Sequence, residues 1–181
     1  MPSEHNATPA GFSLVELMIS LTLIMILTLA LLTSFTFIAR GDQSLANYGE
    51  MNAQARKLLE RIGQDLRTAT DVTNFTATSL TITVPTNTAG TTSQDVIWSY
   101  DSVSRTVSRH DTTGTTQYAK DVEIFSFFYF NSANPSVETT SLVEVKQVQL
   151  RLRMLRLVAS SITSEYVISS QFTMRAKSTA H

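Results

Sequence analysis

The sequence predicts an α+β protein in which one long N-terminal helix precedes an antiparallel β-sheet. Three observations support this prediction. A run of 23 residues without a charge extends from Leu17 to Ala39. A polar segment with apolar residues at helical spacing follows it directly. After Asp71 the chain changes to short segments with the two-residue alternation of β-strands.

Length and composition limit the possible functions. The chain has 181 residues, which is enough for one domain, or one domain with an appendage. Its 14 basic and 15 acidic residues give a formal net charge of −1, so the basic surface of a nucleic-acid binder is missing and nucleic acid is not an expected partner. The absence of cysteine excludes a disulfide framework, a thiolate metal site and a cysteine nucleophile.

The apolar run from Leu17 to Ala39 is long enough to cross a membrane. A helix of this length spans about 34 Å, and the run contains neither glycine nor proline. A buried core helix is the first alternative, but such helices normally show a polar face. A cleaved secretory signal is the second, but its apolar part is shorter and follows basic residues, whereas residues 1–11 contain no Lys or Arg.

Glu16 lies at the N-terminal edge of this run, where a carboxylate needs an explanation. A charge in a membrane helix costs about 2.5–3.5 kcal/mol at the centre and less near the edge, so such a residue usually has a function and a cationic partner. No Lys or Arg lies within two helical turns of Glu16. A cut between Gly11 and Phe12 would create an α-amine one helical turn before it.

The hexapeptide Gly11–Glu16 followed by an apolar helix resembles the processing site of type IV prepilins and type II secretion pseudopilins. The resemblance implies that a prepilin peptidase cuts after Gly11 and methylates Phe12, and that Glu16 stays in the anchor helix for assembly. It also implies a single-pass protein of the bacterial inner membrane, with a cytoplasmic N-terminus and a periplasmic C-terminal domain. The leader lacks the Lys or Arg that usually supports this orientation.

The same resemblance implies four parts. They are a leader peptide, a transmembrane and filament-core helix, an amphipathic second half of that helix, and a periplasmic β-rich pilin-like domain: residues 1–11, 12–39, 40–71 and 72–181. The amphipathic half carries one apolar stripe with spacings of three and four residues, which we expect to pack on the sheet. Its members are Leu45, Tyr48, Asn52, Ala55, Leu59, Ile62, Leu66 and Ala69.

Five to seven strands are expected in the C-terminal part. The clearest segments are residues 80–84, 96–100, 105–109, 122–130, 145–155 and 166–174. Residues 96–100 and 105–109 form a predicted hairpin, and residues 85–94 and 111–117 are expected to be loops because Thr and Gly dominate them. Val122–Phe130 is apolar on both faces, which favours a core strand; a face left open for a neighbouring subunit is the alternative.

The residues that could take part in catalysis do not form an enzyme site. His110 has no nucleophilic serine in a suitable context, so no catalytic residue, cofactor or enzymatic activity is expected. Asp95, Asp101 and Asp111 could surround a calcium ion, but turn aspartates usually cap turns, so no metal site is assigned.

Arg151, Arg153 and Arg156 form the one basic stripe. They are candidate contacts to a partner subunit, and a solvated strand face is the alternative.

These observations together predict a minor pilin-like subunit, a pseudopilin, of the type II secretion pseudopilus. Residues 56–67 and the paired late strands look like GspJ/PulJ-type minor pseudopilins and PilW-type minor pilins. The implied partners are the prepilin peptidase, other pilins or pseudopilins, the inner-membrane assembly platform and the membrane. A minor type IV pilin, a competence pseudopilin for DNA uptake and a signal-anchored periplasmic binding module that never assembles remain alternatives.

Overall fold

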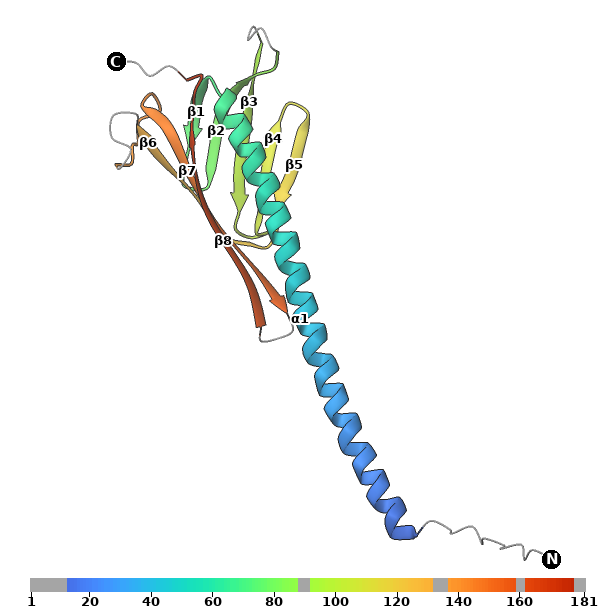
Figure 1. The fold of residues 1–181 in the computed structure, drawn as a ribbon. Coiled ribbons are helices and arrows are strands. Elements are labelled where there is room, and N and C mark those ends of the chain that lie inside the picture. The colour runs from blue at the N-terminus through green and yellow to red at the C-terminus, as the bar shows by residue number, and fades with distance from the viewer. Residues whose placement is uncertain (1–12, 88–91, 132–136, 159–161, 178–181) are drawn as a thin grey trace, which may run out of the picture. The chain divides into compact units, whose positions relative to one another are not determined.

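The computed structural model describes residues 13–87, 92–131, 137–158 and 162–177. One helix, α1 (Leu14–Thr68), precedes eight strands in the described residues (Figure 1). The strands are β1 (Asp71–Phe75), β2 (Ser79–Pro85), β3 (Ser93–Asp101), β4 (Thr106–Asp111), β5 (Gly114–Ala119), β6 (Val122–Asn131), β7 (Val145–Val158) and β8 (Ile162–Thr173). This arrangement confirms the predicted α+β fold with one long N-terminal helix and antiparallel sheets.

Helix α1 is continuous over 55 residues. It runs through Gly41 and Asp42, since one exposed glycine costs only about 1 kcal/mol in a helix. Hydroxyl groups in the apolar part bond within the helix itself. Thr28 and Thr33 donate to the carbonyl oxygens of Ile24 and Leu29 at 2.7 and 2.8 Å, so these side chains need no outside partner.

The chain divides into two compact units, residues 1–42 and 43–181. In the first unit, all described side chains are exposed, and the large apolar residues from Leu14 to Ile38 are each more than half exposed. By length and composition, this part of α1 can cross a membrane. The second unit holds the rest of α1, all strands and the hydrophobic core.

The first five strands form an antiparallel meander in the order β1-β2-β3-β4-β5. It includes the predicted hairpin, in which Tyr100 pairs with Val107. Residues 111–117 were expected to be a loop, but most of them build the β4–β5 hairpin, where Asp111 pairs with Gly114. The prediction failed because β5 is almost entirely exposed and polar and therefore lacks an alternating pattern.

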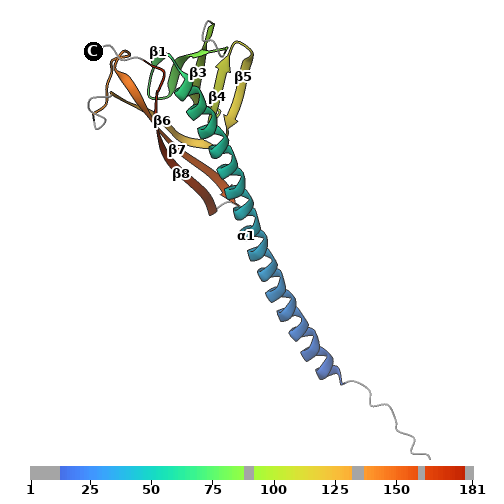
Figure 2. The ribbon, with the colours of Figure 1, turned by 45° about the horizontal axis from the view of Figure 1, so that its top comes forward.

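The last three strands form a separate antiparallel sheet in the order β6-β7-β8, so the structure has two sheets where we expected one (Figure 2). The sheets meet where β6 reaches the turn between β1 and β2. The Phe127 amide donates to the Ala77 carbonyl at 2.7 Å, and the Tyr129 hydroxyl donates to the Thr76 carbonyl at 2.8 Å. Because a turn rather than a strand lies beside β6, the hydrogen-bond ladder ends there.

The C-terminal half of α1 packs on both sheets with a buried face that differs from the predicted stripe. This face consists of Met51, Ala55, Leu58, Ile62, Leu66 and Ala69. The prediction is right from Ala55 onward except at Leu59, which is only half-buried. It is wrong at Leu45 and Tyr48, which are 71% and 41% exposed. The main core therefore begins at Met51.

Strand β6 carries the aromatic part of the core. Phe125, Phe127 and Tyr129 are buried on one face, in agreement with the predicted core strand, and their rings contact one another in sequence. The ring of Tyr100 in the five-stranded sheet lies 5.8 Å from that of Phe125. Its hydroxyl donates to the Val122 carbonyl at 2.9 Å, so these aromatic residues join the two sheets.

Candidate functional site

Glu16 is the described member of the predicted processing and assembly site. It lies in the first turn of α1, where the partial positive charge of the helix N-terminus favours a carboxylate. Its side chain is exposed and forms no ion pair with a described residue. Gly11 and Phe12 lie outside the described residues.

The helix that follows Glu16 presents apolar side chains on all sides. Apolar surface of this extent needs lipid or other helices around it. The hydroxyl of Ser20 donates to the carbonyl of Glu16 at 2.8 Å, which keeps this polar side chain satisfied beside the carboxylate. The arrangement is therefore an anchor with one unpaired acid close to its N-terminal end.

Residues 8–32 match the family model of the prokaryotic N-terminal methylation motif. The match covers Gly11, Phe12 and Glu16 and supports a type IV pilin-like protein. The motif implies processing by a prepilin peptidase and assembly with other pilins, and it indicates a structural subunit, not an enzyme. The N-terminal apolar helix is consistent with membrane anchoring of such a protein. The comparison with curated proteins gave no match for this chain.

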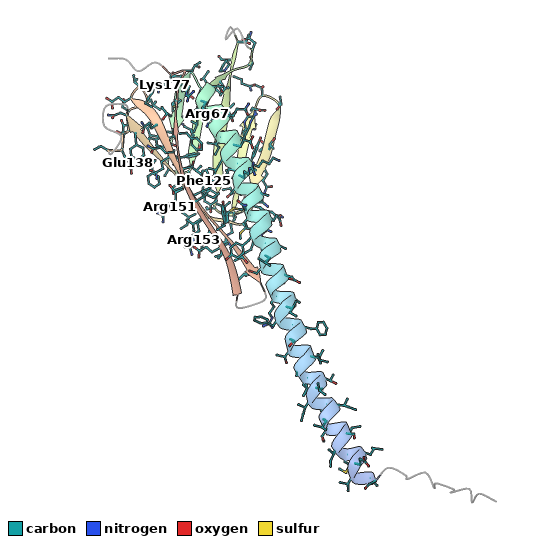
Figure 3. The ribbon with its side chains drawn as sticks, viewed as in Figure 1. Arg67, Phe125, Glu138, Arg151, Arg153 and Lys177 are labelled. Carbon is teal, nitrogen blue, oxygen red and sulfur yellow. The ribbon has the colours of Figure 1, made fainter. Side chains whose placement is uncertain are left out.

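Arg151 and Arg153 lie on the three-stranded sheet, as Figure 3 shows. The guanidinium of Arg153 forms ion pairs with Glu123 at 3.2 Å and Glu165 at 2.8 Å, so neighbouring strands neutralise it. Arg151 is exposed and has no ion pair with a described residue. Of the two, only Arg151 has a charge free for another molecule.

Arg156 does not share their face, because an even-numbered residue of β7 points the opposite way. Its guanidinium bonds Asp121 at 2.6 Å and also Glu50 of α1. Lys120 pairs with the same Glu50 carboxylate at 3.3 Å. Hydrogen bonds from Arg156 and Lys120 lower the pKa of Glu50 from 4.5 to about 2. In the described chain, Arg156 fastens β7 to the helix.

A buried charged cluster surrounds Asp65, and the sequence did not reveal it. Asp65 Oδ2 accepts hydrogen bonds from Arg109 Nε at 2.7 Å and Trp98 Nε1 at 3.1 Å. The side chains of Asp65 and Arg109 are 4% and 6% exposed. Arg61 approaches the other Asp65 oxygen at 3.5 Å. The cluster connects α1 with β3 and β4.

The three aspartates considered for calcium have separate local partners. Asp101 accepts the Val103 amide at 2.9 Å and so caps the β3–β4 turn. Asp95 accepts the Thr83 hydroxyl at 2.8 Å, and Asp111 pairs with Arg109. Among the described residues, no three His, Asp or Glu side chains lie close enough to hold a metal ion.

His110 lies in a strand and not in a catalytic arrangement of described residues. It is an exposed residue of β4, and its Nδ1 lies 2.8 Å from the Thr115 hydroxyl on β5. This contact joins neighbouring strands across the hairpin.

Lys177 is a second buried charge that the sequence did not reveal. Its ammonium group bonds the carbonyl of Leu142 and lies 3.5 Å from the Asp71 carboxylate. Burial lowers the pKa of this lysine, and the nearby Asp71 opposes that effect. The contacts tie the C-terminal segment to the start of β1.

Proposed function

We propose that this chain is a minor pilin-like subunit, a pseudopilin, of the type II secretion pseudopilus. The observation that carries the proposal is the methylation motif over residues 8–32, which runs directly into a helix whose described residues are all exposed and mostly apolar as far as Ile38. A prepilin peptidase cuts after Gly11 and methylates the new N-terminus at Phe12. Residues 12–39 then anchor the chain, and residues 72–181 form the exported domain.

The place of action in this proposal is the bacterial inner membrane and then the filament. The N-terminus starts in the cytoplasm, the C-terminal domain lies in the periplasm, and the inner-membrane assembly platform moves the subunit into the pseudopilus. Residues 56–67 and the long β7–β8 hairpin support a subunit of the GspJ/PulJ or PilW type. The work of such a subunit is mechanical: its helix packs on other helices, and its domain contacts neighbouring subunits.

The role of Glu16 in this proposal is to fix the position of the subunit along the filament. When anchor helices leave lipid and pack together, a carboxylate among them must be paired or neutralised. The α-amine of Phe12, on the same chain or on the next subunit, is the nearest cation after processing. A pair across subunits favours one axial offset, since any other offset leaves a charge in apolar surroundings.

The N-terminus of the mature protein tests the processing step. Mass spectrometry of the full chain from cells with a prepilin peptidase should show methylated Phe12 as the first residue. Gly11→Val should leave precursor in the membrane, because a side chain obstructs the close backbone approach that glycine permits. Ala7→Val, a change of similar size away from the cut, should be processed normally. An intact Met1 in these cells would refute the proposal.

Substitution of Glu16 separates assembly from insertion. Glu16→Leu should still insert and still be processed, because insertion disfavours only the charge and the cut lies before Phe12. It should fail to crosslink with other pilins, since loss of one member of a buried ion pair costs about 3–5 kcal/mol. Thr22→Leu, one and a half turns further on, is the matched control. Normal co-assembly of the Glu16 variant would exclude the register role.

The motif is shared by secretion, pilus and competence machines, so a deletion strain distinguishes these alternatives. Loss of protein secretion with normal pili supports the pseudopilin proposal. Loss of pili or of DNA uptake with normal secretion would instead assign the chain to one of the other two machines. A binding module that never assembles predicts an uncut N-terminus and no crosslinks to pilins.

A further inference from the structure

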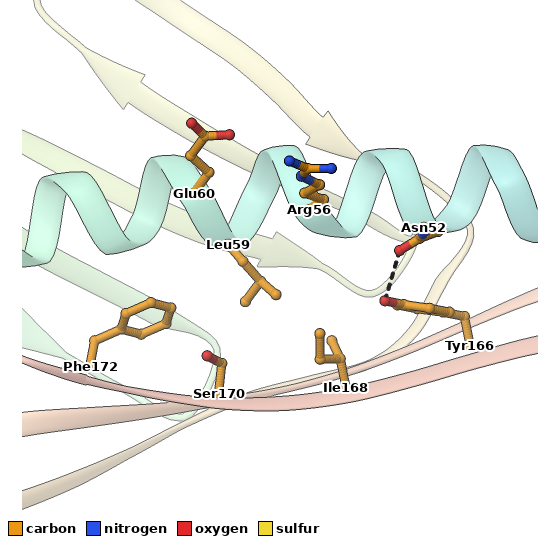
Figure 4. Close-up of a pocket in the computed structure, with 8 residues that line it drawn as sticks. All are labelled: Asn52, Arg56, Leu59, Glu60, Tyr166, Ile168, Ser170 and Phe172. Atoms are coloured by element: carbon orange, nitrogen blue, oxygen red, sulfur yellow. Dashed lines mark hydrogen bonds between the residues drawn. The ribbon is translucent and has the colours of Figure 1, made fainter.

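An open groove of about 450 Å³ lies between α1 and the edge strand β8, within the unit of residues 43–181. Figure 4 shows its two walls. The helix contributes Asn52, Arg56, Leu59 and Glu60, and the strand contributes Tyr166, Ile168, Ser170 and Phe172. None of the functions considered above uses this groove.

The floor of the groove is apolar and incompletely covered. Leu59, Ile168 and Phe172 pack against the hydrophobic core but remain only half-buried. One end carries a polar contact, in which the Tyr166 hydroxyl donates to Asn52 Oδ1 at 3.1 Å (Figure 4). An apolar side chain from outside would complete the burial of the floor.

The helix wall carries two charges without partners. Arg56 and Glu60 are exposed, and neither forms an ion pair or hydrogen bond with a described residue. An acid before a base at a spacing of four residues is the better arrangement for an ion pair on a helix, and here the base comes first. The groove therefore has a positive and a negative site on one rim, one helical turn apart.

Two exposed residues with large apolar side chains precede the groove-lining residues of α1. Leu45 and Tyr48 precede Asn52 by seven and four residues, and Leu59 follows Asn52 by seven. This heptad-like spacing puts them on one lateral side of α1, next to the face that covers the core. The sequence analysis assigned this side to the core, but Leu45 and Tyr48 are exposed.

We propose that this groove receives the amphipathic helix of a different pilin-like subunit. An apolar side chain of that helix enters between Leu59, Ile168 and Phe172. An acidic side chain lies beside Arg56, and a basic one four residues later lies beside Glu60. This order follows from parallel packing, since in the proposed function all anchors enter the membrane in the same direction; the inference rests on that function.

A second copy of this chain does not provide the complementary charges. The acidic residues in the second half of α1 are Asp42, Glu50, Glu60 and Asp65, and the residues four positions later are Ala46, Gln54, Gln64 and Ala69. None of these is basic. Two copies packed in parallel without an axial offset would also bring Arg56 beside Arg56. The partner is therefore a chain of different sequence.

Site-specific crosslinking in living cells tests the inference. The full chain carries a photo-reactive amino acid in place of Ser170, which lines the groove, in cells that make the complete set of pilin-like subunits. Mass spectrometry should identify a crosslink to the first helix of another chain with the methylation motif, at a segment with an acid four residues before a base. The same probe in place of Val103, which is 91% exposed at the β3–β4 turn, should not give this crosslink.

Charge reversal provides the matched comparison. The double variant R56E/E60R should lower the crosslink yield roughly ten-fold, because like charges would then face each other. Exchange of the acidic and the basic residue that face these two positions on the partner should restore the crosslink yield. R67E, an exposed change on the same helix outside the groove, should leave the yield unchanged. Circular dichroism should show the same fold in all variants.

Four results would overturn the inference: a crosslink only to a second copy, a crosslink to a protein without the motif, a yield that the reversal does not change, or no crosslink at all. These results are separable from failure of the proposed function. A chain that begins at Phe12 and reaches the filament without the crosslink refutes only the groove. A chain that retains Met1 refutes the proposed function itself.

Discussion

The buried cluster of Asp65, Arg109 and Trp98 allows a quantitative prediction about stability. Asp65→Ala removes the carboxylate that accepts from Arg109 Nε at 2.7 Å and from Trp98 Nε1 at 3.1 Å. The guanidinium then stays buried with only Asp111 beside it, and the indole N–H has no acceptor. The change should therefore destabilise the domain much more than loss of an exposed ion pair would.

The magnitude follows from burial. Removal of one partner from a buried ion pair costs about 3–5 kcal/mol, and an unsatisfied buried N–H adds about 1–3 kcal/mol. The two effects overlap, because the surrounding structure can relax to admit water. We expect a loss of about 4 kcal/mol in the free energy of unfolding, a large part of the total stability of a domain of this size.

The protein contains its own probe for this measurement, since Trp98 is its only tryptophan. Urea unfolding of the full chain in mild detergent can be followed by Trp98 fluorescence and, independently, by circular dichroism. The double variant D65L/R109M replaces both charges with apolar groups. It should recover more than half of the loss, because the penalty comes from the unpaired charge.

Two results would refute this reasoning. A loss below about 1 kcal/mol for Asp65→Ala would show that solvent reaches the cluster, as it does for exposed pairs. A double variant as unstable as the sum of Asp65→Leu and Arg109→Met would show that the two side chains act independently. Glu60→Ala on the exposed side of the same helix is the control and should change stability by less than about 0.5 kcal/mol.

Two further predictions concern contacts between the helix and the strands. Arg156 and Lys120 hold the pKa of Glu50 near 2, below its value of 4.5 in an unfolded chain. A lowered pKa in the folded state stabilises it above pH 4.5, and this contribution is lost as the pH falls toward 2; Glu50→Gln should flatten the dependence of the urea midpoint on pH in that window. At Gly63, an added Cβ would lie 2.8 Å from Phe172 Cε1. Gly63→Ala should destabilise by about 1 kcal/mol because crowding outweighs the gain in helix propensity, and Phe172→Leu in the same chain should reverse the sign; a stabilising single variant would contradict this.

The sequence predicts those parts of the fold that depend on local pattern. Helix α1 has no proline to interrupt it, and residues 122–130 form an apolar run of the length of a strand, so both were predictable. Strand β5 was not, because polar residues such as Thr115 and Gln117 carry no periodic signal when neither face is buried. The number of sheets was not predictable either, since it depends on where the β1–β2 turn meets β6.

The residues of the candidate site also include some that local sequence predicts and some that it does not. Gly11, Phe12 and Glu16 form a contiguous motif and need no tertiary information. The burial of Asp65 could not be predicted from the sequence, because the partners that permit this burial lie 33 and 44 residues away in the chain. The sequence alone predicts that the side chains of Arg151 and Arg156 lie on opposite faces of the sheet, since an odd and an even residue of one strand point to opposite faces. Grouping them as one stripe overlooked that signal.

The contacts of α1 with the last strand, β8, determine the order in which the domain can fold. Ser44 lies 3.1 Å from Ser164, and Asn52 bonds Tyr166. The partners in these contacts are 120 and 114 residues apart in the chain. The apolar face of α1 therefore leaves the ribosome early and stays uncovered until the C-terminal hairpin has been made. Long-range closure of this kind slows folding and exposes the early segment to aggregation. A chain truncated before β8 would keep its helix but lose these contacts with the last strand.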